Sequence, residues 1–183
     1  MARPLLIVPG LGGSGPSHWQ SVWESELPDA TRVEQADWDQ PHRDAWIAAV
    51  RQAIAAKPGS VVVAHSLGCI LLAHLLAEHP ETPVAAALLV APADVERLTP
   101  APECVRRFAP VPTNRLPFPS IVVASGNDPF ASFARAESLA AAWGAELIDV
   151  GNAGHINVEA GFGPWAAGRA ILDHLITRID AGR

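Results

Sequence analysis

The chain has 183 residues, enough for one well-packed core and short for two, and 49% of them are hydrophobic while 17% are charged. The formal net charge is −6 without any basic cluster, which makes nucleic acid and anionic membrane surfaces poor candidates as partners. The sequence has no apolar run long enough to cross a bilayer, and we expect a single domain over residues 1–183.

The N-terminal residues 1–13 contain one arginine and a short apolar run. A signal peptide needs a longer apolar stretch and a small-residue cleavage site, so we interpret this run as the first strand of the fold. Cys69 and Cys104 form neither a disulfide framework nor a metal-binding pattern, and no metal site is expected. The reducing cytoplasm is therefore the expected compartment.

Strand-like and helix-like segments alternate along the chain. Short apolar runs that end at Pro or Gly predict buried strands, and apolar residues spaced three or four apart predict helices. In chain order, we predict strand 5–9, helix 17–27, strand 31–36, helix 41–56, strand 60–64, helix 68–79, strand 84–91, strand 120–125, helix 130–144, strand 145–150 and helix 164–179. This alternation predicts an α/β fold: an open, mostly parallel six-stranded sheet with helices on both faces.

Residues 92–119 interrupt the alternation. They contain seven prolines, and a proline-rich segment cannot form a long helix. We expect a short excursion over the sheet edge, with one helical turn near residues 103–108. The segment is too short to form a separate cap domain, which predicts a shallow, open pocket.

Ser66 lies between the strand at 60–64 and the helix at 68–79. In an open parallel sheet, ligands bind outside the carboxyl ends of the strands. Ala64 and Gly68 are small, as the strand–turn–helix form of the G-x-S-x-G motif requires, and Ala64 adds only a methyl group. The alternative is that Ser66 merely caps the helix, because serine is a favoured N-cap residue.

A nucleophilic serine needs a base, and the base needs an acid that orients it. Asp128 follows the strand at 120–125 and His155 follows the strand at 145–150, which gives the order Ser, acid, His of this fold class. Asp94 is the rival acid, and Asp128 could instead be a turn residue before a proline. The joint occurrence of all three residues favours nucleophilic catalysis.

The oxyanion of a tetrahedral intermediate needs two N–H donors. The backbone N–H of Leu67, at the start of a helix, is the first candidate, and Leu11 in the Gly-rich loop after the first strand is the second. Gly12 is the alternative to Leu11. Such a loop could also hold a dinucleotide, but no G-x-G-x-x-G with a downstream acidic residue is present.

Aromatic residues near these loops could form the substrate pocket together with Gly12. Trp38 follows the second strand, while Trp19 and Phe130 flank the loops that carry the candidate catalytic residues. The alternative for each of them is ordinary packing in the core.

Five sequence blocks carry a family resemblance: VPGLGGSGPSHWQSVWE from residue 8, ADWDQP from 36, VVVAHSLGC from 61, SGNDPF from 125 and GHINVEAGFGPW from 154. Together they resemble the small YdeN-like α/β-hydrolases, also described as retinoblastoma-binding-protein-9-like serine hydrolases. The resemblance implies an α/β-hydrolase fold, a triad of Ser66, Asp128 and His155, and cleavage of small esters or amides without a cofactor.

The leading hypothesis is a serine hydrolase that cleaves a small ester, or an amide, through an acyl-enzyme. A protein-interaction module that retains the hydrolase fold is a different class of function, and fold alone does not exclude it. A haloperoxidase, a thioesterase or a C–C hydrolase would use the same three residues. The expected partner is a small molecule, and the sequence does not identify a protein partner.

Overall fold

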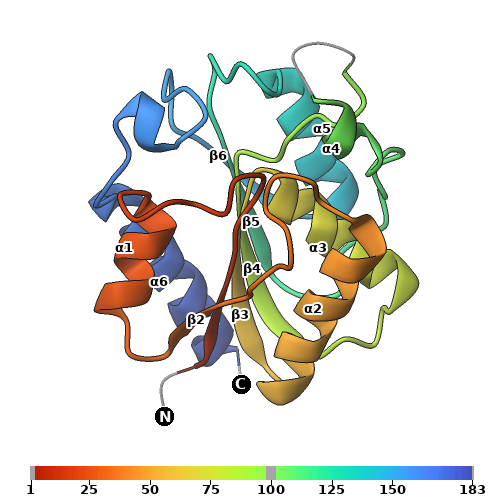
Figure 1. Ribbon diagram of the computed structural model, residues 1–183. Coiled ribbons are helices and arrows are strands. Elements are labelled where there is room, and N and C mark those ends of the chain that lie inside the picture. Colours follow the sequence, from red (N-terminus) through yellow and green to blue (C-terminus); the bar gives the residue numbers. More distant parts are fainter. Residues whose placement is uncertain (1–2, 98–101, 183) are drawn as a thin grey trace.

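The computed structural model describes residues 3–97 and 102–182 (Figure 1). Six strands form one sheet in the order β2-β1-β3-β4-β5-β6, and every neighbouring pair is parallel. The strands are β1 (Leu5–Val8), β2 (Ala30–Arg32), β3 (Ser60–His65), β4 (Val84–Val90), β5 (Ser120–Ala124) and β6 (Glu146–Asp149). The predicted α/β fold with an open six-stranded parallel sheet is confirmed.

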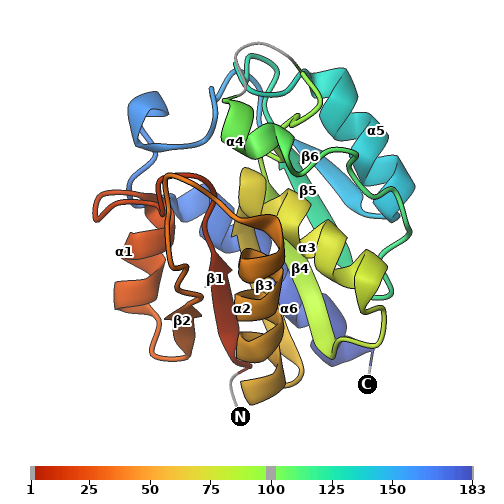
Figure 2. The same ribbon diagram turned by 45° about the vertical axis from the view of Figure 1, so that its right-hand side comes forward.

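Helices cover both faces of this sheet, as Figures 1 and 2 show. The helices are α1 (Trp19–Glu26), α2 (Arg43–Ala56), α3 (Leu67–Glu78), α4 (Glu103–Arg106), α5 (Phe133–Trp143) and α6 (Ala166–Ala181), with a 3₁₀ turn, η1 (Val158–Ala160). The helices α1 and α6 pack on one face, while α2, α3 and α5 pack on the other. None of the helices within the described ranges has the length and hydropathy to cross a membrane.

The four central strands, β1, β3, β4 and β5, are apolar on both faces because both faces are covered. In β1, Leu6 and Val8 belong to the core under α2, α3 and α5, whereas Leu5 and Ile7 belong to the core under α1 and α6. This burial explains the continuous apolar runs of the sequence, which are typical of parallel sheets. The two cores hold the sheet rigidly, and the loops at the carboxyl ends of its strands extend from this rigid base.

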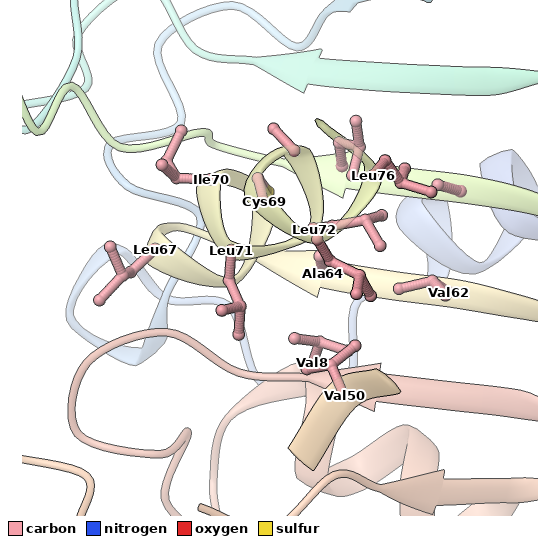
Figure 3. Packing of buried hydrophobic residues seen from close by; sticks show 14 of the residues in the cluster. Val8, Val50, Val62, Ala64, Leu67, Cys69, Ile70, Leu71, Leu72 and Leu76 are labelled. Carbon is pink, nitrogen blue, oxygen red and sulfur yellow. The ribbon is translucent and has the colours of Figure 1, made fainter. Parts of the chain in front are cut away.

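Helix α3 is buried along nearly its whole length, which distinguishes it from the amphipathic helices around it. Figure 3 shows it lying across β3, with Leu71 directed toward Val8 and Val50 and Leu72 lying beside Ala64. A helix that is apolar all round belongs in a core. This burial fixes the start of α3, and therefore Ser66 before it, relative to the central strands.

Most predicted element ends lie within one or two residues of the observed ends, and strand β2 and helix α5 differ more. Strand β2 is shorter than predicted because it is an edge strand with one neighbour, and the chain leaves the sheet after Val33. Helix α5 begins after Ser132, whose hydroxyl caps it by accepting the Arg135 N–H at 3.1 Å. The single turn predicted near 103–108 is α4, and part of the predicted excursion, 98–101, lies outside the described residues.

Candidate active site

Ser66 occupies a sharp turn between β3 and α3. Its φ of 54° lies in the left-handed region, which non-glycine residues seldom adopt outside functional sites. A Cβ at position 68 would collide with the carbonyl oxygen of Val8, so only glycine allows α3 to approach β1 this closely. The Ser66 hydroxyl makes no capping hydrogen bond to α3, which removes the support for a purely capping role.

The hydroxyl instead meets the imidazole of His155. The distance from Ser66 Oγ to His155 Nε2 is 2.8 Å, and His155 Nδ1 lies 2.9 Å from Oδ2 of Asp128. A carboxylate only accepts, so Nδ1 carries the hydrogen and the lone pair of Nε2 faces the serine. The side chains of His155 and Asp128 are 9% and 3% exposed. The structure thus brings the three predicted residues into one buried hydrogen-bonded chain.

Asp94, the rival acid, is bonded elsewhere. Its Oδ1 accepts the backbone N–H of Glu96 at 3.2 Å and lies 3.6 Å from Nε of Arg135. No hydrogen bond joins this carboxylate to His155 in the described part of the chain. Asp128 is therefore the carboxylate that orients His155 in this structure.

Two polar side chains that the sequence analysis did not single out connect the loops after β5 and β6. Asn127 Oδ1 accepts the Gly154 N–H at 2.7 Å and the Ser125 hydroxyl at 2.9 Å. The oxygen of that hydroxyl in turn accepts the Ala153 N–H at 2.9 Å. Ser125 is buried and Asn127 is exposed, so these hydrogen bonds run from the core to the surface of the loop. They hold the loop of Asp128 against the loop of the histidine.

Two of the predicted pocket residues support the site from behind instead of lining the cavity. Trp19 is fully buried, and its indole N–H donates to the carbonyl of Ile156 at 2.9 Å, directly after the histidine. Trp38 accepts the Gly12 N–H with its carbonyl at 2.9 Å, and its ring packs against Gly13. Trp19 therefore lies in the core, and the half-buried Trp38 packs against its edge; neither lines the cavity.

The same contact favours Leu11 over Gly12 as the candidate for the second oxyanion donor. The Gly12 N–H is already used by Trp38, whereas the Leu11 N–H makes no hydrogen bond to the part of the chain that the structure describes. The Leu67 N–H is the first of α3 and has no partner within the helix. Gly10 brings the two segments together, since a Cβ there would lie 3.0 Å from the Leu67 nitrogen.

A cavity of about 350 Å³ opens beside Ser66, at the small end of the range for ligand sites. Two of its lining residues, Gly12 and Phe130, belong to the predicted pocket. The excursion forms one wall instead of only passing over the sheet edge, with Ala93, Asp94, Val95, Pro102 and Val105 lining the cavity. Leu11 and Val158, 38% and 47% exposed, give the mouth an apolar rim.

The charges of this cavity are acidic. Asp94 and Glu159 line it, and neither lysine nor arginine is found among its lining residues in the described ranges. Arg135 is shared between Asp94, at 3.6 Å, and Glu96, at 2.6 Å, whereas Glu159 has no ion-pair partner among the described residues. The cavity therefore favours neutral ligands over anions.

Two further histidines, His18 and His65, are buried against this site. His65 Nε2 lies 2.9 Å from the carbonyl oxygen of His155, to which it donates, and the two rings are 4.9 Å apart. Burial, with the nearby His155 and His18, holds the pKa of His65 well below its ordinary value. Burial first, then Arg32 and His155, lowers the pKa of His18 to about 4. Both rings are therefore neutral near neutral pH.

We expect the free energy of unfolding to decrease as the pH falls from 6.5 toward 4. In this range the unfolded chain binds protons at these two histidines and the folded chain does not. The contribution of the two neutral histidines to the stability of the folded protein is therefore fully present above pH 6.5 and is lost as the pH falls below it. Each histidine contributes a slope approaching about 1.4 kcal/mol per pH unit. Urea unfolding at several pH values should give a shallower slope for His18→Gln, with the exposed His174→Gln as control, and an unchanged slope would contradict the assignment.

The described residues, 3–97 and 102–182, contain no group of three His, Cys, Asp or Glu side chains placed to hold a metal ion. Cys69, in the first turn of α3, is fully buried, and its thiol contacts the carbonyl of Val90 at 3.5 Å. Burial raises the pKa of this thiol well above its ordinary value. A buried protonated thiol of this kind packs as a small hydrophobic group and is not a nucleophile.

The sequence profile of the serine hydrolase family matches residues 5–174 of this chain. The structure is similar to that of a protein from Pectobacterium atrosepticum described as a YdeN-like hydrolase, with 37% identity and a TM-score of 0.85 over 96% of this chain and 91% of that one. No functionally curated protein matches the sequence significantly.

Two more distant structures share the fold. The ydeN gene product of Bacillus subtilis is 21% identical, with a TM-score of 0.79 over 96% of this chain and all of that one. A thermophilic esterase from Thermogutta terrifontis is 13% identical, with a TM-score of 0.68 over 98% of this chain and 91% of that one. At these identities the likeness extends to the fold alone.

Proposed function

The chain belongs to the serine hydrolase family, and on that premise we propose that it cleaves small, uncharged carboxylic esters through an acyl-enzyme on Ser66. The observation that carries the proposal is the hydrogen-bonded chain from Ser66 Oγ through His155 to Asp128. This arrangement supplies a nucleophile, a base and a group that orients the base, at the mouth of a small cavity.

In the acylation step, His155 Nε2 takes the hydroxyl proton as Ser66 Oγ attacks the ester carbonyl carbon. The carbonyl π electrons move to the oxygen, which we place between the N–H groups of Leu11 and Leu67. Asp128 stabilises the imidazolium that forms. When the tetrahedral intermediate collapses, the bond to the alkoxy oxygen breaks, and this oxygen takes the proton from His155 to leave as the alcohol.

In the deacylation step, a water molecule takes the place of the alcohol. His155 Nε2 removes one proton from the water as its oxygen attacks the acyl carbon, and the proton passes to Ser66 Oγ when the acyl bond breaks. The products are the carboxylic acid and the free serine. Every proton moves through one nitrogen, which explains why a single tautomer of His155 must be maintained.

We expect neutral 4-nitrophenyl esters of short acids, such as the acetate and butyrate, to be cleaved with an initial burst of 4-nitrophenol. The dodecanoate should be slower because its chain extends beyond a cavity of about 350 Å³. The anionic 4-nitrophenyl hemisuccinate should show a kcat/KM a few-fold below that of the butyrate, because Glu159 repels it across solvent at the rim. Steady-state absorbance measures kcat/KM, and stopped-flow absorbance measures the burst of 4-nitrophenol.

Glu159→Gln should reduce the ratio of kcat/KM for the butyrate to kcat/KM for the hemisuccinate by about threefold. This is the effect of removing one solvent-screened charge at close range. Glu137→Gln is the matched control, because Glu137 is an exposed carboxylate on α5 and does not line the cavity. A preference of the wild type for the hemisuccinate would contradict the proposed substrate charge. Absence of turnover with every ester of the series would contradict the proposed reaction.

A further inference from the structure

His18 lies at the end of the Gly-rich loop, directly before α1, and lines the cavity beside Ser66. Its side chain is the N-cap of α1, since Nδ1 accepts the backbone N–H of Gln20 at 3.2 Å. The ring packs edge-on against His65, with centroids 4.9 Å apart. These contacts fix the ring in one orientation, with Nδ1 toward the helix and the opposite nitrogen, Nε2, on the side away from it.

The capping bond also fixes the tautomer. A neutral imidazole carries one hydrogen, and because Nδ1 accepts, that hydrogen is on Nε2. His18 is only 5% exposed, and Nε2 is buried without a hydrogen-bond partner in the described part of the chain. A buried donor without a partner destabilises the folded protein and is rare, so its presence needs an explanation.

The surroundings of the ring keep it uncharged. Burial, followed by the positive charge of Arg32 and the proximity of His155, lowers the pKa of His18 to about 4. A second imidazolium next to His155 would also oppose the charge that His155 gains during acylation. His18 therefore presents a neutral N–H donor near neutral pH.

We propose that the Nε2–H of His18 donates a hydrogen bond to an uncharged acceptor oxygen of the bound substrate, next to the bond that Ser66 attacks. The inference rests on the proposed ester hydrolysis. It makes His18 a substrate-binding residue contributed by the β1–α1 loop, on the same loop as Leu11. It also explains why this loop is held so firmly: Gln20 Nε2 donates to the Val63 carbonyl at 3.1 Å, and the Ser14 hydroxyl donates to Gln20 Oε1 at 2.7 Å.

Two substitutions separate substrate binding from helix capping. His18→Asn retains an acceptor near the position of Nδ1, which suits an N-cap, but has no donor at the position of Nε2. His18→Gln places an amide N–H near the position of Nε2 but is a poor cap. We expect His18→Asn to reduce kcat/KM for 4-nitrophenyl acetate about tenfold while its melting temperature stays close to that of the wild type. His18→Gln should lower the melting temperature more but retain more of the activity.

Pre-steady-state kinetics locate the acceptor oxygen. If it belongs to the alcohol side, His18→Asn slows the burst and leaves hydrolysis of the acetyl-enzyme unchanged. If it belongs to the acyl side, both steps slow. Either result supports the inference. It would be overturned if His18→Asn kept full activity while the activity of His18→Gln fell only in step with its stability. His18 would then be a helix cap alone.

The proposed reaction is tested separately by the wild-type protein. Turnover by the wild type with an unaffected His18→Asn variant would refute the role of His18 and leave the hydrolase mechanism intact. A folded wild type without turnover would refute the reaction itself, and the inference about His18 with it.

Discussion

Ser66→Ala is expected to reduce the turnover of 4-nitrophenyl acetate by roughly 10⁴-fold or more and to abolish the burst. The substitution removes the only atom that His155 activates, Oγ at 2.8 Å. It keeps the Cβ, so the backbone strain at φ 54° is unchanged, and the lost hydroxyl caps no helix N–H. The free energy of unfolding should therefore change by no more than about 1 kcal/mol.

Stopped-flow absorbance and urea unfolding measure the two effects on the same preparation. Ser138→Ala is the matched control because Ser138 is an exposed serine on α5, away from the cavity, and its substitution should leave turnover unchanged. If Ser66→Ala kept a substantial part of the wild-type rate, another nucleophile would have to be responsible.

Asp128→Asn should lower kcat by about 10⁴-fold without unfolding the protein. Oδ1 of Asp128 accepts the Phe130 N–H at 2.8 Å, so the amide oxygen of asparagine would be held there. The amide NH₂ would then take the place of Oδ2, 2.9 Å from Nδ1 of His155, which favours an Nδ1 that accepts and carries no hydrogen. The hydrogen of the imidazole moves to Nε2 and points at Ser66. Nε2 then has no free lone pair with which to take the serine proton.

Asp94→Asn is the comparison that distinguishes the two acids. Asp94 lines the cavity and pairs with Arg135, so its loss should reduce kcat/KM by at most about tenfold. Initial rates of both variants with 4-nitrophenyl acetate, together with their melting temperatures, decide the question. A larger loss for Asp94→Asn than for Asp128→Asn would transfer the role of the acid to Asp94.

The fold and the positions of Ser66, Asp128 and His155 were accessible from sequence because they depend on local patterns. The central strands are apolar runs; Ser66 follows one of them directly, whereas Asp128 and His155 lie in the loops after β5 and β6. In a parallel sheet all these strand ends lie at one edge, which brings residues distant in sequence together. The structure places them within hydrogen-bond distance.

The walls of the cavity were not accessible in the same way. Trp19 and Trp38 were expected at the substrate, but the direction of a side chain in a loop depends on tertiary partners, here the carbonyl of Ile156 and the ring contact with Gly13. His18 was not among the predicted site residues, because its unpartnered Nε2 becomes visible only with the cap contact to Gln20. The one sequence signal was its place at the end of the Gly-rich loop.

The most direct test of Ser66 as the nucleophile is the intact mass of the protein after exposure to a fluorophosphonate. This reagent reacts with activated serines and loses fluoride. We predict one adduct on the wild type, localised to Ser66 by peptide mapping, and no adduct on Ser66→Ala. No adduct on a folded wild type, or the same adduct on both proteins, would contradict the assignment of Ser66 as an activated nucleophile.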